Sequence, residues 1–178
     1  MHRAYFLIFF LLISLFSAAQ NLDQKNNSTQ VNFKIKNFGS YVDGCFSDVN
    51  VDSSFDLNNL SESYINSEIL VKSINTNNEK RDSHLRNEDY FEANTYPVIN
   101  LVSIKIEKSL TNTFILTAKL TIKNIVKTIQ IPIEIIENNN ELQLLAKFDI
   151  NRIDYGVGEK SWVLSNEVKI EVNHTIAK

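Results

Sequence analysis

The stretch "VNFKIKNF", residues 31–38, alternates apolar and polar side chains at a period of two. Val31, Phe33 and Ile35 fall on one face, and an Asn or Lys follows each of them. This alternation is typical of a β-strand with one face buried and the other in water. The stretch therefore predicts a half-buried strand, and the same pattern recurs along most of the chain.

Seven further segments repeat this alternation: "YVDGCFSDV" with "SSFDL" as its continuation, "YINSEILVKSI", "PVINLVSIKIE", "FILTAKLTIK", "TIQIPIEII", "ELQLLAKFDINRI" and "EVKIEVNHTI". About eight strands at this spacing are expected of an all-β sandwich or barrel. The clean alternation favours antiparallel pairing. In "INLVSIKI" the apolar set changes face, which predicts a bulge near Ser103 or a strand covered on both faces.

One segment, "KRDSHLRNEDYFEANTYP" at residues 80–97, lacks this pattern and favours a helix. Asn77 or Asn78 can cap its start, and Pro97 stops its continuation. Its large apolar groups are few: Leu85, Tyr90 and Phe91. A helix with so narrow an apolar stripe needs a hydrophobic surface to lie on. We therefore predict a short helical segment near residues 78–91 that covers the open end of a barrel.

The first nineteen residues, "MHRAYFLIFFLLISLFSAA", predict a secretory signal peptide with cleavage before Gln20. The alternative is an anchor helix, but the apolar run from Ala4 to Phe16 is shorter than the roughly 20 residues that span a bilayer. Residues 20–178 then form one domain. The expected location is the periplasm or the outside of the cell.

Composition excludes some functions. The net charge is −3 and no Lys/Arg cluster exists, which argues against nucleic acid as a partner. Cys45 is the single cysteine, so an internal disulfide is excluded, while a reactive thiol or an intermolecular bridge stays open. The sequence lacks a nucleophile elbow, a phosphate-binding glycine loop and an HExxH motif, so we predict no enzyme and no catalytic residue. A paired-carboxylate hydrolase is the remaining enzyme alternative.

An ordered series of motifs resembles the YceI-like family of exported lipid-binding proteins, from about Thr29 to Val172. Its most specific parts are Arg81-Asp82-x-His84-Leu85, Tyr96-Pro97, Leu120-Thr121 and Ile150-Asn151-Arg152-x-Asp154-Tyr155-Gly156. The resemblance implies an all-β fold, an eight-stranded antiparallel lipocalin-like barrel with a helical segment against it. It also implies that long apolar chains such as polyisoprenoids bind inside the barrel.

The inward faces of the predicted strands, together with the helical segment, give the candidate lipid-binding residues. These are Phe33, Ile35, Val42, Phe46, Ile65, Ile69, Val71, Leu85, Phe91, Ile99, Leu101, Leu116, Leu120, Ile122, Phe148, Ile150, Trp162 and Ile170. Val31, Val168 and Val172 share these faces, and His174 should lie at a solvated strand end. The alternative for every member is plain core packing.

Two polar residues are candidate head-group contacts, His84 and Arg152. A structural pairing of Arg152, for instance near Asp154, is the alternative, because buried arginine seldom stands unpaired. His84 and Glu88 lie at helical spacing but are too few for a metal site, so we expect neither a metal nor any cofactor other than bound lipid.

The predicted function is to bind and sequester or carry a long-chain apolar lipid in the cell envelope. A polyisoprenoid, an isoprenoid quinone and a fatty-acid-like molecule all fit this prediction. The alternative is an envelope interaction or assembly module whose barrel is filled by its own side chains. The sequence leaves open a transient contact with a membrane and a homodimer.

Overall fold

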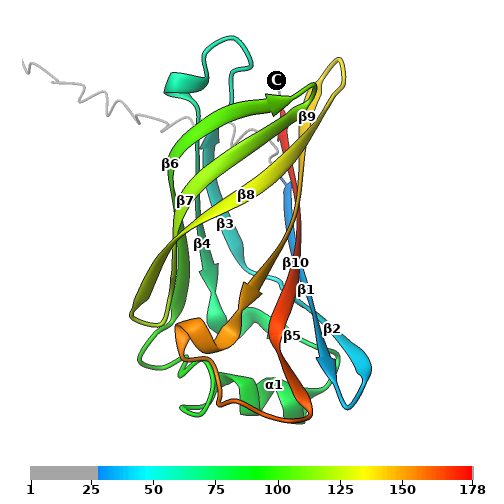
Figure 1. The fold of residues 1–178 in the computed structure, drawn as a ribbon, viewed down its shortest axis with the longest axis vertical. Helices are drawn as coiled ribbons and strands as arrows, with labels where there is room; N and C mark the ends of the chain where they lie inside the picture. The colour runs from blue at the N-terminus through cyan, green and yellow to red at the C-terminus, as the bar shows by residue number, and fades with distance from the viewer. Residues whose placement is uncertain (1–27, 178) are drawn as a thin grey trace, which may run out of the picture.

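A computed structural model describes residues 28–177, so the predicted signal peptide at residues 1–19 lies outside the described residues. Ten strands form the fold: β1 Ser28–Asn37, β2 Ser40–Phe46, β3 Val49–Ser54, β4 Tyr64–Leu70, β5 Ile74–Asn75, β6 Val98–Leu110, β7 Thr113–Ile122, β8 Ile125–Glu137, β9 Glu141–Asn151 and β10 Leu164–Ala177. The helices are α1 Glu79–Arg86 and the 3₁₀ turns η1 Leu60–Glu62, η2 Val71–Ser73 and η3 Arg152–Tyr155. The fold class is therefore all-β (Figure 1).

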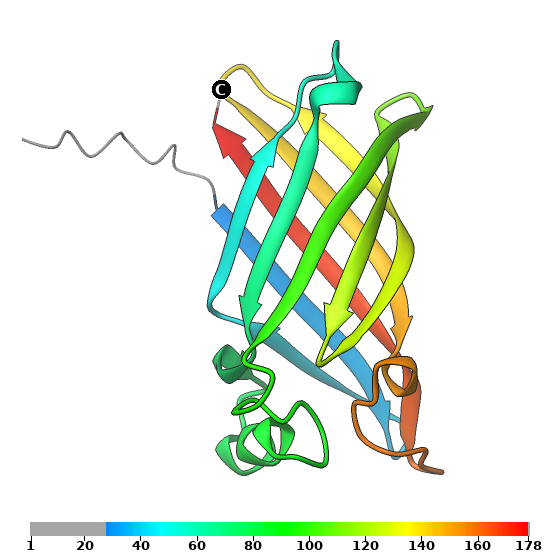
Figure 2. The same ribbon diagram turned by 90° about the vertical axis from the view of Figure 1, so that its left-hand side faces the viewer.

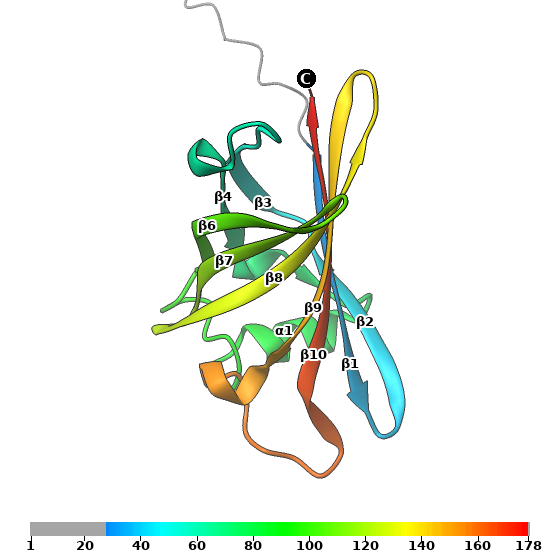
Figure 3. The ribbon, with the colours of Figure 1, turned by 45° about the horizontal axis from the view of Figure 1, so that its top comes forward.

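All ten strands belong to one antiparallel sheet in the order β3-β4-β6-β7-β8-β9-β10-β1-β2-β5. The sheet curls around a common interior (Figure 3). The two edge strands, β3 and β5, are each connected by the backbone to a strand near the opposite edge of the sheet. β3 follows β2 after two residues, and β5 follows β4 after η2. Two backbone hydrogen bonds cross these breaks, from Ser47 N to Ser73 O at 3.2 Å and from Leu70 N to Asp48 O at 3.0 Å.

The strand count of eight needs a correction. Two of the predicted strands are each divided in two: β2 and β3 share one, and β4 and β5 share the other. The first half of each pairs with one neighbour and the second half with another, since β2 pairs with β1 and β3 pairs with β4. The alternating pattern continues through such a break, so the sequence alone could not reveal it.

Burial follows the alternation that predicted the strands. In β8 every second residue from Ile131 to Ile135 is buried and the residues between are exposed. The predicted bulge is confirmed, because the register of β6 against β7 shifts between Ser103 and Lys105. The shift leaves Ile104 outside and returns Ile106 to the buried face.

Helix α1 lies at the end of the barrel where β1 finishes and β10 begins (Figures 1 and 2). Asn78 caps it by accepting a hydrogen bond from Arg81 N at 3.0 Å, which is one of the two predicted caps. The helix ends at Arg86, and turns lead on to Pro97, so the helical part is shorter than the predicted 78–91. Within residues 28–177, no helix is long and apolar enough to cross a membrane.

Candidate functional site

The curled sheet encloses a cavity of about 890 Å³. Strands from nearly the whole sheet and helix α1 contribute its wall. The structure brings together sixteen of the predicted lipid-binding residues there: Phe33, Ile35, Val42, Phe46, Ile65, Ile69, Leu85, Phe91, Ile99, Leu101, Leu116, Leu120, Ile122, Phe148, Ile150 and Ile170. Val31, Val168 and Val172 also line the cavity, as do the two candidate head-group contacts.

Two residues of the predicted set lie elsewhere. Val71 is 1% exposed and packs in a buried cluster with Ala93 and Tyr155, because η2 turns the chain at this point. Trp162 is fully exposed on the loop before β10. The alternation at residues 64–74 suggested a continuous strand, and no local pattern distinguishes an exposed loop tryptophan from a packed one.

The structure also adds wall residues that the prediction missed. Ile131 and Ile133 come from β8, and Leu144 and Ala146 come from β9. Their alternation in "TIQIPIEII" and "ELQLLAKFDINRI" was a sufficient signal. Tyr90 joins them from the turns after α1, where periodicity gives no such signal.

Part of the barrel interior is filled and part is open. Near one end Phe55 and Phe114 meet edge to face at 5.4 Å within a packed cluster. Along β10, in contrast, Val168, Ile170 and Val172 line the cavity and are only half-buried. Inward apolar residues of a filled barrel would be fully buried, so the cavity is space that the protein's own side chains leave open.

The cavity opens beside α1. Residues that line the cavity there and are also exposed to solvent are Asn78, Lys80, Ser83, His84 and Asn87. The opening thus carries the exposed polar side chains of a wall that is otherwise mostly apolar. In a ligand with an apolar chain and a polar end, the chain would contact the apolar wall and the polar end would contact the polar residues at the opening.

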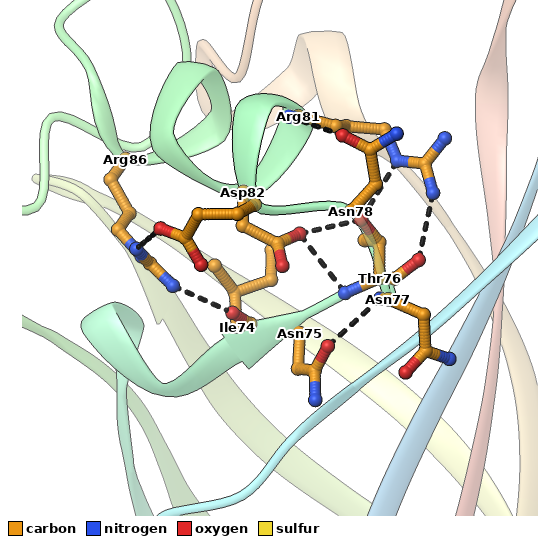
Figure 4. Close-up of polar contacts among 9 residues, drawn as sticks. Ile74, Asn75, Thr76, Asn77, Asn78, Arg81, Asp82 and Arg86 are labelled. Atoms are coloured by element: carbon orange, nitrogen blue, oxygen red, sulfur yellow. Dashed lines mark hydrogen bonds and ion pairs between the residues drawn. The ribbon is translucent and has the colours of Figure 1, made fainter.

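Two charged residues of α1 fix it to the chain before it (Figure 4). Asp82 is 3% exposed, and its Oδ1 accepts hydrogen bonds from Thr76 N at 3.0 Å and Thr76 Oγ1 at 2.5 Å. Arg81 donates from Nε to Thr76 Oγ1 and from Nη2 to Thr76 O, both at 2.8 Å. These bonds orient the helix, and they place the Arg81 guanidinium in the cavity wall.

His84 lies at the opening, where its ring meets Tyr90 edge to face at 5.0 Å. Within residues 28–177, no group of three or more His, Cys, Asp or Glu side chains gathers as metal ligands would. His84 and Glu88 therefore stand without a third ligand among the described residues.

Arg152 is held by backbone carbonyls. Its guanidinium is buried and donates to Ser165 O at 2.9 Å, to Val157 O at 2.8 Å and to Glu159 O at 2.8 Å. Burial lowers its pKa. Asp154, the suggested partner, instead pairs with Lys127 at 2.9 Å. Arg152 thus fixes the loop before β10, and this use of its donors leaves little for a head group.

His174 was expected at a solvated end, and that expectation is wrong, because its side chain is 4% exposed. Its Nδ1 lies 2.8 Å from Thr29 Oγ1 and its Nε2 lies 2.9 Å from Ser53 Oγ. Burial lowers its pKa, and a hydrogen bond with the backbone of Ser28 opposes this shift in part. The residue lines the far part of the cavity with a buried imidazole.

A curled antiparallel sheet around a mostly apolar cavity defines the class of β-barrel proteins with an internal cavity. The YceI-like domain profile matches residues 21–176, so the chain belongs to the YceI-like family. A UPF0312 protein of Photorhabdus laumondii is 30% identical over 117 residues, 65% of this chain and 60% of the relative. The YceI protein of Shigella flexneri is 27% identical over 129 residues, 72% of this chain and 67% of the relative.

Three solved structures share the fold. BcnA of Burkholderia cenocepacia superposes with a TM-score of 0.79 at 24% identity, over 83% of this chain and 95% of its own. The YceI protein of Campylobacter jejuni gives 0.71 at 26% identity, over 78% and 86%. A polyisoprenoid-binding domain of Saccharophagus degradans gives 0.63 at 15% identity, over 84% and 94%. The matched region spans 60% to 64% of the length of three of the relatives.

Proposed function

We propose that this protein binds a long-chain apolar lipid in its cavity and sequesters or carries it in the cell envelope. A polyisoprenoid, an isoprenoid quinone and a fatty-acid-like lipid all meet the requirement. The observation that carries the proposal is the apolar cavity of about 890 Å³, open beside α1. Ligand cavities in proteins are commonly about 300–1,000 Å³, so this one suits a single large ligand.

Burial of the apolar chain supplies the driving force for binding. Each methylene that leaves water contributes about 0.8 kcal/mol, so twenty methylenes contribute roughly 16 kcal/mol before the cost of association and of ordering the chain is subtracted. Tight binding therefore requires a long chain. Holding the lipid needs no catalytic group, so the protein acts as a binding protein and not as an enzyme.

The distribution of polar and apolar residues in the cavity determines which end of the ligand lies at the opening. Its chain lies along β10, against Val168, Ile170 and Val172, and its polar end lies at the opening. Lys80 and Arg81 line that opening, and neither forms an ion pair with another residue of 28–177. An arginine has five N–H donors, so the bonds to Thr76 leave donors for an anionic or carbonyl head group.

The comparisons support the same proposal. A solved neighbour is described as a polyisoprenoid-binding domain, although it shares only 15% identity and thus indicates the fold. The alternative, an assembly module with a filled barrel, is not favoured because half-buried inward residues such as Ile170 face open space.

A titration with cis-parinaric acid, a fatty acid whose emission rises in apolar surroundings, tests the proposal. We expect a saturable rise at one ligand per protein and displacement by an unlabelled polyprenol. A rise that never saturates, or one that acid-unfolded protein gives equally, would refute binding in the cavity.

A further inference from the structure

Two loops at the α1 end of the barrel lie side by side and expose large apolar side chains. Phe38, in the turn between β1 and β2, donates from its backbone N to Val163 O at 2.9 Å. Phe38 is 78% exposed and Trp162 is fully exposed. With Tyr41 and Val163, which are also exposed, they form what we call the aromatic tip. The two loops that carry these residues lie at the α1 end of the barrel (Figure 2).

Phe38 has an unfavourable backbone as well as an exposed ring. Its φ is 48° and that of Gly39 is 80°, so both central residues of this hairpin turn have positive φ. Such turns favour Asn-Gly, and a bulky residue there is strained. A strained residue that holds its ring in water stabilises little in the isolated fold, which points to a role in contact with something else.

The aromatic tip lies at the rim of the cavity. Asn37 and Leu164 are paired across β1 and β10, and both line the cavity. Phe38 directly follows Asn37, and Val163 directly precedes Leu164. Whatever surface covers the tip therefore lies next to the cavity wall.

Cations flank the tip. Lys36 and Lys160 are exposed, and the Nζ of Lys36 lies 5.8 Å from the centre of the Tyr41 ring. Neither lysine forms an ion pair with another described residue. Aromatic rings next to lysines are the composition that favours the layer between lipid head groups and acyl chains, with anionic lipids adding to the attraction.

We propose that the aromatic tip inserts into the interfacial layer of a lipid bilayer and sets the cavity rim against the membrane. A ligand could then pass between bilayer and cavity without crossing water. This exchange rests on the proposed function, whereas the membrane contact does not. The tip is too small for a stable protein interface, which takes about 20–30 residues on each side.

Trp162 is the single tryptophan of the chain and reports directly on insertion. Vesicles of phosphatidylcholine and phosphatidylglycerol should shift its emission to the blue and protect it from acrylamide. Emission and quenching that stay unchanged with vesicles in excess would overturn the proposal.

Variants separate the tip from the fold. Phe38→Asn creates the favoured Asn-Gly turn, so the protein stays folded, and loss of one phenyl group should weaken vesicle binding about tenfold or more in co-sedimentation. Leu110→Asn is the control, because Leu110 is 70% exposed near the opposite end of the barrel and should leave vesicle binding unchanged. Equal loss in both variants would overturn the proposal.

A third measurement distinguishes the two proposals. Parinaric acid added from ethanol should bind Phe38→Asn as it binds the wild type, while its transfer from vesicles should slow about tenfold. If neither protein binds the probe but vesicles still shift Trp162, the proposed function fails and the membrane contact stands. Light scattering that shows tip-dependent self-association, without vesicle binding, would assign the tip to a second copy and overturn the membrane proposal.

Discussion

The ring of Phe33 on β1 lies over Gly44 on β2, so close that a Cβ atom at Gly44 would come within 2.8 Å of Phe33 Cε1. The two residues are register partners. Phe33 is the first of three neighbouring rings. The centres of the Phe33 and Phe46 rings lie 5.7 Å apart, and those of Phe46 and Phe91 lie 6.2 Å apart. The absent side chain at Gly44 therefore lets Phe33 lie against the wall and keeps the cavity wide.

Replacing Gly44 should narrow the cavity. Gly44→Val would displace the Phe33 ring toward the ligand space, so we expect parinaric acid to bind at least about tenfold more weakly, with overpacking lowering stability by about 1–3 kcal/mol. Asp43→Val on the neighbouring outward position should leave binding unchanged, because Asp43 is exposed. Undiminished binding by a folded Gly44→Val protein would contradict this account of the wall.

A charge in the wall should prevent lipid binding. Ile69 lines the cavity, and Ile69→Lys places an ammonium group in apolar surroundings, which costs several kcal/mol unless it is paired. We expect loss of measurable binding, or loss of folding, which circular dichroism would detect. Glu68→Lys adds the same side chain to the exposed face one residue earlier and should bind normally.

Acid should weaken the fold through His174. Burial holds its pKa below the ordinary 6.5, so the unfolded chain binds the proton more readily than the folded one. The stabilisation is present above pH 6.5 and is lost as the pH falls through the lower, folded-state pKa. Urea unfolding of wild type and His174→Gln across this range should show the wild type losing more stability.

His84 supplies the control for this pH dependence, because its side chain is exposed. His84→Gln should keep the acid sensitivity of the wild type. If His174→Gln keeps it as well, groups other than His174 cause the acid effect.

Arg152 should stabilise the loop before β10. Arg152→Met removes the donors to three carbonyls, and unsatisfied buried groups cost about 1–3 kcal/mol each, so we expect a loss of several kcal/mol in urea unfolding. Limited proteolysis should cut near Glu159 earlier than in the wild type. Lys127→Met breaks the exposed ion pair with Asp154 and a contact of 5.8 Å between Lys127 Nζ and the centre of the Tyr155 ring, and it should cost at most about 2 kcal/mol. Similar losses in the two variants would disprove the special role of Arg152.

The alternation of side chains was enough to predict most of the cavity wall, because a strand in a curled sheet has one inward face. Ile170 and Phe148 were found in this way, from different segments. Residue type and position alone narrowed the helix cap to Asn77 or Asn78, and Asn78 is the cap. Strand alternation and helix capping could be predicted because each depends on residues that are close together in the sequence.

The wrong predictions concern residues whose surroundings are formed by segments far away in the sequence. His174 looked like a solvated end, but β10 continues to Ala177, and its side chain meets Thr29 on β1 and Ser53 on β3, strands from the start of the chain. Arg152 bonds to carbonyls of a loop whose path no pattern predicts. The aromatic tip depends in the same way on two loops that are more than a hundred residues apart.

The central claim is that the cavity holds an apolar chain, and native mass spectrometry of purified protein tests it most directly. After incubation with a polyprenol, the wild type should gain the mass of one ligand, and Ile69→Lys should gain none. A wild type that stays at its bare mass with polyprenols, quinones and fatty acids alike, or an equal gain by the folded variant, would contradict the claim.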